Sequence, residues 1–256
     1  MDKTQNEYDG RANFKADDDT EAQLDAHFEA FDISKRLIYR NFPLFTRTIT
    51  IKRFLAHYEL FRMTVDLPGD IVELGVYRGL TLFTWAKFLD VRNNNDRAKQ
   101  VFGFDNWAGF LEFVEQDGPP APRVNKVIGG YDAGEFHASV ENLIKIYDGD
   151  RFIPHKPRIL LVDGQIEYTV PEFVKKAPGR KISLMHIDCD IYVPTKAALK
   201  QLWPMIVRGG VLVLDDYGIS EWAGETKAVD EYFADKDVEI KRFHWAQCPG
   251  AYIVKK

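Results

Sequence analysis

Four aspartates follow two apolar runs of the sequence, and their spacing suits a metal site or an acid–base pair. The run LMHI ends in Asp188-Cys189-Asp190, and the run GGVLVL ends in Asp215-Asp216. Carboxylates that converge at one place repel one another unless a positive group lies among them. Oxygen ligands without a zinc-type spacing of cysteine and histidine favour a hard ion. The pattern therefore predicts a site for Mg²⁺ or a similar divalent cation.

A divalent cation at this place would activate a hydroxyl group. A sugar hydroxyl is a poor nucleophile at neutral pH, and coordination to Mg²⁺ lowers its pKa and orients it. A neighbouring carboxylate or histidine can then take the proton as a general base. Two adjacent hydroxyls of one sugar could chelate the ion together and aim one oxygen at a methyl group.

Other uses of these side chains remain open at this point. An aspartate is favoured at a helix N-cap, and Asp190 shortly precedes the helical pattern VPTKAALKQL. Cys189 should point away from its neighbours, because successive side chains of an extended segment alternate. His186 lies inside an apolar run and is expected to be a core histidine. His244, in RFHWAQ, could reach the mouth of a site or be structural.

A glycine turn follows the first apolar run after the N-terminal region. The segment VELGVYRG places Glu73, Gly75 and Gly79 where a strand should turn into a helix. Gly75 permits a tight turn and a close approach of the backbone to a ligand. The segment is neither a dinucleotide fingerprint nor a P-loop, because it lacks the three glycines of the first and the Gly-Lys-Ser/Thr of the second. A simple strand-to-helix turn is the alternative.

Two further strand ends carry groups that suit an adenosine-type ligand. The run VFGF ends in Asp105, whose carboxylate could accept hydrogen bonds from both hydroxyls of a ribose. The run LLV ends in Asp163-Gly164, where the edge of an adenine could be recognised. An acidic residue such as Glu73 near the first turn would suit a cationic methyl donor, which has no phosphates to hold.

Strand-like and helix-like patterns alternate from residue 70 to about 235 and should place these groups together. Such alternation predicts a doubly wound α/β fold with a mostly parallel sheet, and ligands of these folds bind beyond the carboxyl ends of the strands. We expect seven strands, with an antiparallel strand at one edge, from the runs DIVELGV, QVFGFD, RILLVDG, KISLMHID, GGVLVLDD, DVEIKRF and GAYIVKK. Residues 1 to about 22 are polar and should be irregular, and helices should precede the first strand.

Composition excludes several classes of protein. The net charge of −5 provides no broad basic surface for nucleic acid or an anionic membrane. No window approaches the ~18 apolar residues of a membrane span, and the N-terminus lacks the basic and apolar parts of a signal peptide. Two cysteines cannot form a disulfide framework. We therefore expect a cytoplasmic protein, and the aromatic N-terminal region favours a homo-oligomer.

Four segments of the chain resemble the macrocin O-methyltransferase family, whose members methylate sugar hydroxyls in natural-product biosynthesis. They are LPGDIVELGVYRG, VFGFDNWAGF, DGQIEYTVPEF and HIDCDIYVPTKAALKQLWPMIVRGGVLVLDDYG. The resemblance covers roughly residues 68–220. It implies a class I methyltransferase fold that uses S-adenosylmethionine and Mg²⁺, with a helical extension over residues 1–66, as a lid or an oligomer contact, and a methyltransferase domain over 67–256.

The resemblance also implies roles for individual residues. Asp188, Asp215 and Asp216 would hold Mg²⁺, and Asp190 would be the general base, with His244 as a second catalytic candidate. The methyl donor would be lined by Glu73, Gly75, Gly79, Asp105, Asp163 and Gly164. The sequence departs from the family at Cys189, where a glycine is common, and at Gln165-Ile166, where the family has Trp-Phe.

Two other functions compete with a sugar O-methyltransferase acting on a small-molecule deoxysugar. A metal-dependent glycosyltransferase could use the D-x-D pair to hold a sugar nucleotide, although the Glu73/Gly75 turn and the second aspartate pair argue against it. A binding protein could keep the fold without catalysis, although four intact carboxylates argue against that. Binding of S-adenosylhomocysteine separates the first function from both alternatives.

Overall fold

The helical N-terminal region begins earlier than expected. The computed structural model describes residues 14–256, and α1 (Phe14–Ala30) starts at its first residue. The expectation of an irregular segment up to about residue 22 is therefore wrong from Phe14 on, because TEAQLDA consists mostly of good helix formers. For residues 1–13 that expectation lies outside the described part of the chain.

The sheet has seven strands in the order β3-β2-β1-β4-β5-β7-β6. Strands β1 to β5 are mutually parallel, and β7 runs antiparallel to both β5 and the short β6 outside it. The predicted fold class is thus confirmed. The strands are β1 (Asp70–Leu74), β2 (Val101–Asp105), β3 (Ile159–Asp163), β4 (Ile182–Ile187), β5 (Ile206–Leu214), β6 (Ile240–Lys241) and β7 (Ala251–Val254).

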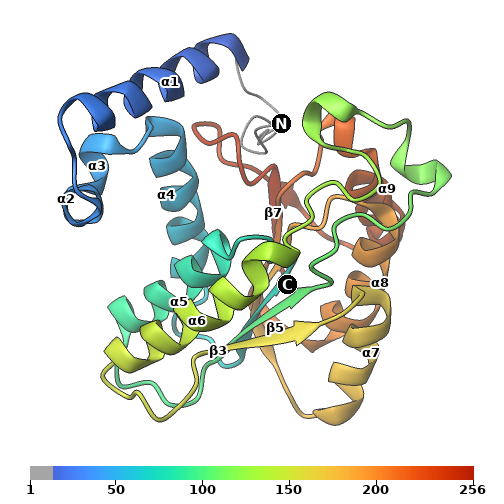
Figure 1. The fold of residues 1–256 in the computed structure, drawn as a ribbon. Helices are drawn as coiled ribbons and strands as arrows, with labels where there is room; N and C mark the ends of the chain where they lie inside the picture. The colour runs from blue at the N-terminus through green and yellow to red at the C-terminus, as the bar shows by residue number, and fades with distance from the viewer. Residues whose placement is uncertain (1–13) are drawn as a thin grey trace.

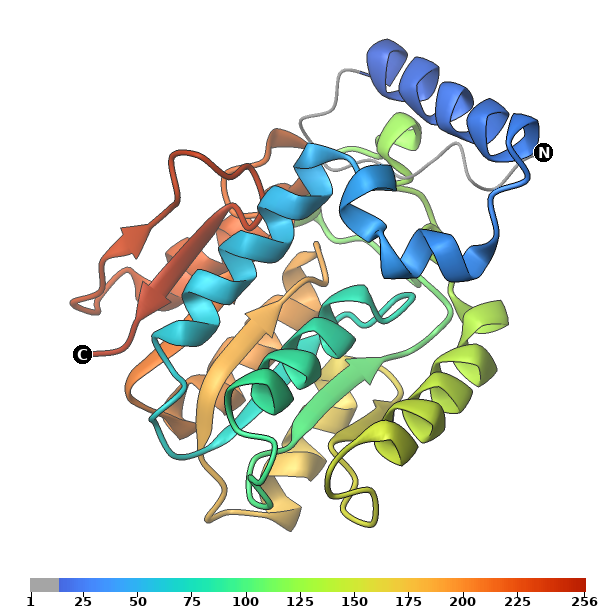
Figure 2. The ribbon, with the colours of Figure 1, turned by 90° about the vertical axis from the view of Figure 1, so that its left-hand side faces the viewer.

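Helices cover both faces of the sheet, and two apolar clusters fill the layers between them (Figure 1). Every residue of the central strand β4 is buried, which explains its continuous apolar run. One cluster joins the sheet to α7 (Ile166–Lys176), α8 (Tyr192–Leu202) and α9 (Ala223–Phe233). The other joins it to α4 (Thr48–Arg62), α5 (Leu80–Arg92) and α6 (Gly134–Asp150), which lie side by side in Figure 2.

Helix α4 connects the N-terminal helices to the sheet. Its Phe54 and Tyr58 rings lie 4.8 and 5.1 Å from the ring of Phe88 on α5. The helices before it are α1, α2 (Lys35–Arg40) and α3 (Phe42–Phe45), which lie at the end of α4 away from β1 (Figure 1). Helices thus occupy most of residues 14–62, and the last of them, α4, packs against α5 of the sheet layer. Within residues 14–256, no helix has the length and apolarity that a membrane span requires.

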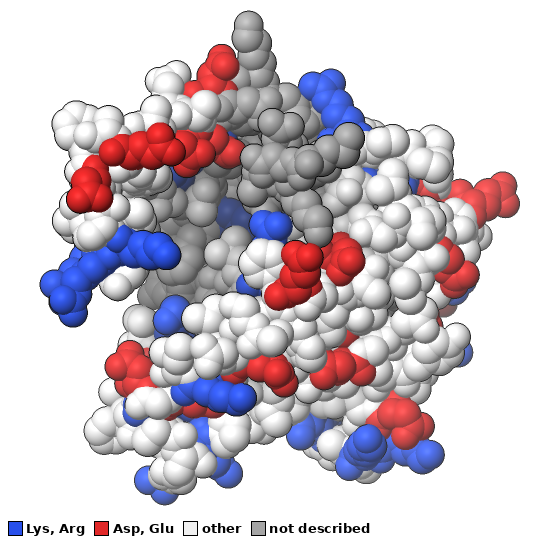
Figure 3. Space-filling model, in the orientation of Figure 1, with Lys and Arg blue, Asp and Glu red and all other residues white. Residues whose placement is uncertain are grey.

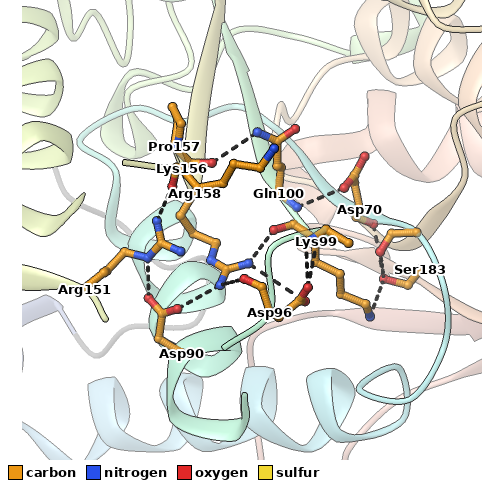
Figure 4. Close-up of polar contacts among 12 residues, drawn as sticks. Asp70, Asp90, Asp96, Lys99, Gln100, Arg151, Lys156, Pro157, Arg158 and Ser183 are labelled. Atoms are coloured by element: carbon orange, nitrogen blue, oxygen red, sulfur yellow. Dashed lines mark hydrogen bonds and ion pairs between the residues drawn. The ribbon is translucent and has the colours of Figure 1, made fainter. Parts of the chain in front are cut away.

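An ion network fixes the amino ends of the strands, opposite the candidate site (Figure 4). Arg158, which is 1% exposed, directly precedes β3 and donates to Asp90 Oδ1 at the end of α5 at 3.0 Å. It also donates to the Asp96 carbonyl at 2.9 Å, and Arg151 donates to Asp90 Oδ2 at 3.0 Å. A buried guanidinium thus ties β3, α5 and α6 together.

Replacing Arg158 with methionine is expected to lower the free energy of unfolding by about 3 kcal/mol, because removing one partner leaves a buried charge poorly compensated. Urea unfolding followed by circular dichroism measures the change. The matched control is Lys175→Met, since Lys175 forms only an exposed pair with Glu172 at 3.8 Å and should change stability by less than ~1 kcal/mol. Equal effects of the two substitutions would contradict a structural role for the buried network.

Candidate active site

A large cavity opens at the carboxyl ends of the parallel strands. Its volume is about 1700 Å³, whereas a pocket for one drug-sized ligand has roughly 300–1,000 Å³. The N-terminal helices border it on one side, and Figure 3 shows lysine and arginine side chains within the hollow. The cavity therefore has room for two ligands at once.

Three of the four predicted aspartates converge on its floor. Carboxylate oxygens of Asp188, Asp215 and Asp216 lie within 4.8 Å of one another. They follow β4 and β5, which pair in parallel with Ile187 opposite Leu214. Because the strands end in register, the aspartates face the same volume. The convergence that the sequence predicted is present, and the three residues can hold one cation.

Arg53 provides a positive charge that the sequence did not reveal. It lies on α4, and its Nη2 donates to Asp188 Oδ2 and to Asp215 Oδ2, at 3.1 Å each. Both contacts join segments more than a hundred positions apart in the chain, so no local pattern indicates them. A single nitrogen bridges two carboxylates here, and Arg53 Nε is buried without a partner among the described residues.

The charges of this cluster show how well it suits a cation. Burial raises the pKa of Asp188 and of Asp216, and the neighbouring aspartates raise both pKa values further. Burial has the same effect on Asp215, but Arg53 and His186 outweigh it and hold the pKa of Asp215 well below its usual range. Three carboxylates converge where Arg53 contacts only Asp188 and Asp215 among them, and their oxygen donors fit a divalent ion of the Mg²⁺ type.

Asp190 lies on the cavity wall beside the cluster of Asp188, Asp215 and Asp216. Its φ of 64° is a left-handed conformation that is uncommon outside glycine. Burial raises the pKa of Asp190 to about 7; a hydrogen bond with Asp216 opposes this shift and the charge of Asp188 adds to it. The N-cap of α8 is Ile191, so Asp190 does not fill the helix-capping role that the sequence left open. A carboxylate with this pKa is suited to general-base catalysis.

A buried polar layer lies beneath the carboxylates. His186, the expected core histidine, is fully buried, with Nδ1 3.5 Å from Glu73 Oε2 and Nε2 3.2 Å from Asp215 Oδ1. Although burial favours the neutral ring, hydrogen bonds to Asp215 and Glu73 raise the pKa of His186 to about 10. His57 of α4, also buried, lies 3.9 Å from Asp215 Oδ1. Burial, with His186 and Arg53 nearby, lowers the pKa of His57 well below its usual value.

The glycine turn after β1 lies next to the aspartate cluster. Gly75 has a φ of 93°, and a Cβ there would lie 1.8 Å from the Asp188 carbonyl oxygen, so this close approach of the chain ends requires glycine. Asp105 Oδ2 accepts hydrogen bonds from the amides of Val76 and Tyr77 at 2.7 and 2.8 Å. Both Gly75 and Asp105 line the cavity. Asp105 therefore shapes the turn and keeps only its remaining lone pairs for a ribose.

The other predicted cofactor residues lie off the described cavity wall. Glu73 is buried against His186, and Gly79 is the N-cap of α5. Asp163 Oδ1 accepts a hydrogen bond from Trp107 Nε1 at 2.7 Å and lies 3.3 Å from His137 Nε2. Gly164 follows it, and the cavity is lined instead by the next residues, Gln165 to Glu167.

Aromatic side chains line the wall beside Asp190. Phe110 and Tyr131 come from the long connection after β2, and Trp222 comes from the turn before α9. Their ring centroids lie 5.5 to 6.0 Å apart. His244 also lines the cavity and is exposed, so it reaches the mouth as expected. Cys189 points toward Thr195, with 3.5 Å between Sγ and Oγ1, and thus away from the aspartates.

The fold and the site together define a class I methyltransferase. The strand order defines the fold. The turn after β1 and the carboxylates beyond β4 and β5 lie at the carboxyl ends of the strands, where ligands of such folds bind. The model of the Macrocin-O-methyltransferase (TylF) family matches residues 2–247, and the chain belongs to this family. It is therefore an S-adenosylmethionine-dependent sugar O-methyltransferase, and neither the glycosyltransferase nor the non-catalytic alternative is favoured.

Named relatives and solved structures agree with this assignment. The chain is 28% identical over 196 residues to 8-demethyl-8-(2,3-dimethoxy-alpha-L-rhamnosyl)-tetracenomycin-C 4'-O-methyltransferase of Streptomyces olivaceus, covering 73% of this chain and 69% of the relative. It is 27% identical to Mycinamicin III 3''-O-methyltransferase of Micromonospora griseorubida, covering 79% and 78%. The crystal structure of the calicheamicin methyltransferase CalS11 superposes with a TM-score of 0.85 at 26% identity, covering 92% and 91%.

Proposed function

We propose that the protein is a Mg²⁺-dependent O-methyltransferase that transfers the methyl group of S-adenosylmethionine to a hydroxyl of a deoxysugar such as a rhamnose. One observation carries the proposal: three carboxylates and a fourth aspartate with a pKa of about 7 meet in a cavity large enough for donor and acceptor. Family membership supports the transfer reaction, and the donor set supports the ion.

In this proposal the chain binds the ion and moves one proton. Asp188, Asp215 and Asp216 would hold Mg²⁺, which when bound would lower the pKa of a nearby sugar hydroxyl. Asp190 accepts the proton of the sugar hydroxyl at its carboxylate. The hydroxyl oxygen bonds to the methyl carbon as the bond from that carbon to the donor sulfur breaks, and S-adenosylhomocysteine leaves. His244, at the mouth of the cavity, is the second candidate for proton transfer.

The turn after β1 and the aromatic wall would position the two substrates. The methyl donor would lie against Gly75 and Asp105, beyond β1 and β2. Its adenine would lie near Gln165 and Ile166. The acceptor sugar packs its apolar face on Phe110, Tyr131 and Trp222, which suits a deoxysugar because it has fewer hydroxyls. Holding donor and acceptor in line supplies much of the acceleration.

The relatives leave two forms of acceptor to compare. One acts on a rhamnosyl tetracenomycin, by its name, and a second structure of CalS11, with a TM-score of 0.77 at 25% identity, is described as a TDP-rhamnose 3'-O-methyltransferase. A sugar on an aglycone and a sugar on a nucleotide are the two forms to test, and the volume of the cavity admits both.

Calorimetry and a labelled-methyl assay test the proposal. We expect S-adenosylhomocysteine to bind the purified chain, and label to pass from S-adenosylmethionine to nucleotide-linked rhamnoses or to rhamnosylated natural products. Added Mg²⁺ should be required. A chain that binds no S-adenosylhomocysteine would rule out the methyltransferase, and transfer that is unaffected by chelation would rule out the ion.

We further propose that the chain forms a homo-oligomer through its N-terminal helices. Phe31, Tyr39, Phe42 and Leu44, on or between α1 to α3, are 52 to 76% exposed. Clustered exposed apolar side chains are a feature of protein–protein contacts. Light scattering should give at least twice the chain mass, and Phe42→Ser with Leu44→Ser should shift it towards the monomer. A wild-type monomer would contradict the proposal.

A further inference from the structure

We propose that His57, His186 and Asp215 form a second metal site, which selects a borderline transition metal such as Co²⁺ or Zn²⁺ rather than Mg²⁺. It shares Asp215 with the candidate magnesium site and lies on the other side of that carboxylate. One ligand atom from each of the three residues lies within 4.8 Å of the others. Two imidazoles and one carboxylate are a ligand set that suits zinc, cobalt and iron.

His57 provides the observation that points to a missing ligand. The ring is 2% exposed, and its Nε2 has no hydrogen-bond partner among the described residues. This atom lies 3.9 Å from Asp215 Oδ1, too far for a hydrogen bond. A buried polar atom without a partner calls for a water or an ion that satisfies it. A metal between Nε2 and the carboxylate would do so.

Glu73 orients the second histidine for coordination. Its Oε2 lies 3.5 Å from His186 Nδ1, and His186 Nε2 faces Asp215 Oδ1 at 3.2 Å. A carboxylate behind the distal nitrogen of a ligating histidine is the usual arrangement in metal sites, because it fixes the ring and its tautomer. A metal at Nε2 replaces the proton that His186 shares with Asp215, and that proton leaves to solvent.

The two oxygens of Asp215 face chemically different surroundings. Oδ1 faces the two histidines, whereas Oδ2 contacts Arg53, which also binds Asp188. Imidazole nitrogens favour Co²⁺, Zn²⁺ and Cu²⁺, while the carboxylate oxygens of Asp188 and Asp216 favour Mg²⁺. The thiol of Cys248 lies 3.0 Å from both Asp215 oxygens and lines the cavity, so it offers a further soft donor on the cavity side of this carboxylate.

Occupation of this site should weaken the candidate magnesium site. The shared carboxylate would donate to the transition metal and become a poorer ligand for Mg²⁺. This consequence rests on the proposed function, whereas the site itself does not. A transition metal would therefore act as an inhibitor that added Mg²⁺ does not readily displace.

The test uses the full chain after dialysis against a chelator. Co²⁺ is titrated with and without excess Mg²⁺, and binding is followed by the visible absorption of the metal. We expect a Co²⁺ site that survives excess Mg²⁺. His57→Gln should weaken it by more than about 100-fold, and Glu73→Gln, which alters the carboxylate behind His186, by about 10- to 100-fold. The control His244→Gln changes an exposed cavity histidine and should leave the site unchanged.

A second measurement needs no variant, so the test stands even if His57→Gln fails to fold. Cu²⁺ bound to the wild-type chain should show imidazole-nitrogen hyperfine coupling in its electron paramagnetic resonance spectrum. Absence of tight Co²⁺ binding, oxygen-only ligands, or equal binding by a folded His57→Gln chain would each overturn the proposal. Nitrogen-ligated metal in a chain that binds no S-adenosylhomocysteine would support the site while refuting the proposed function.

Discussion

Replacing Asp190 with asparagine is expected to lower kcat by about 10²- to 10⁴-fold while leaving S-adenosylhomocysteine affinity unchanged. The substitution keeps the shape of the side chain but removes the group that accepts the hydroxyl proton. Burial raises the pKa of Asp190 to about 7. Wild-type kcat/KM should therefore rise with pH up to that value, because only the ionised carboxylate accepts a proton, and bound Mg²⁺ should move this rise to lower pH.

Initial rates with labelled donor, measured across pH, test this role. The Asp190→Asn chain should lose the rising limb together with most of the rate. Asp235→Asn is the matched control, because the Asp235 side chain is 85% exposed and does not belong to the cavity lining. If the Asp190→Asn enzyme retained the wild-type kcat, another group would have to be the general base, and His244 would be the next residue to test.

Chelation is expected to abolish methyl transfer, and Asp188→Asn is expected to raise the Mg²⁺ concentration for half-maximal rate by more than about 100-fold. Loss of a direct carboxylate ligand should exceed the 10- to 100-fold cost of losing an outer-shell partner. Asp188 is also one of the two carboxylates that Arg53 bridges, so its neutral amide would leave the guanidinium bound to Asp215 alone.

The effect of Asp188→Asn can be measured in two ways: the rate of methyl transfer as a function of Mg²⁺ concentration, and calorimetric titration of the protein with Mg²⁺. Glu112→Gln is a suitable control, since Glu112 lines the cavity but is exposed, and it should keep the wild-type requirement for Mg²⁺. Activity of Asp188→Asn that was full and independent of metal would show that the aspartate cluster has another purpose.

Patterns along the chain were sufficient to predict the sheet and the convergence of Asp188, Asp215 and Asp216. Continuous apolar runs mark buried parallel strands, and parallel strands bring their carboxyl ends to one edge. The direction of Cys189 also follows from simple alternation, as its contact with Thr195 confirms. Positions that depend only on the strand ends are thus readable from sequence.

Roles that depend on long-range contacts were not readable. Arg53 and His57 reach the aspartates from α4, and their only local signal is a four-residue spacing that places them on one helix face, with His57 buried beside Ala56, Leu60 and Phe61. The bonds from the Val76 and Tyr77 amides to Asp105 join two different strand ends, so no local pattern indicates them. The partners of Asp163 likewise come from other segments.

The bridge made by Arg53 affects how this enzyme should be screened for ligands. A ligand that binds only the folded state raises the melting temperature in proportion to its binding free energy. Here an incoming ion competes with a guanidinium that already stabilises the same two oxygens, so part of the gain is offset by the ion pairs it weakens. The melting temperature and a direct titration should therefore report the same weakened net affinity, and a ligand screen needs more Mg²⁺ than three unpaired carboxylates would require.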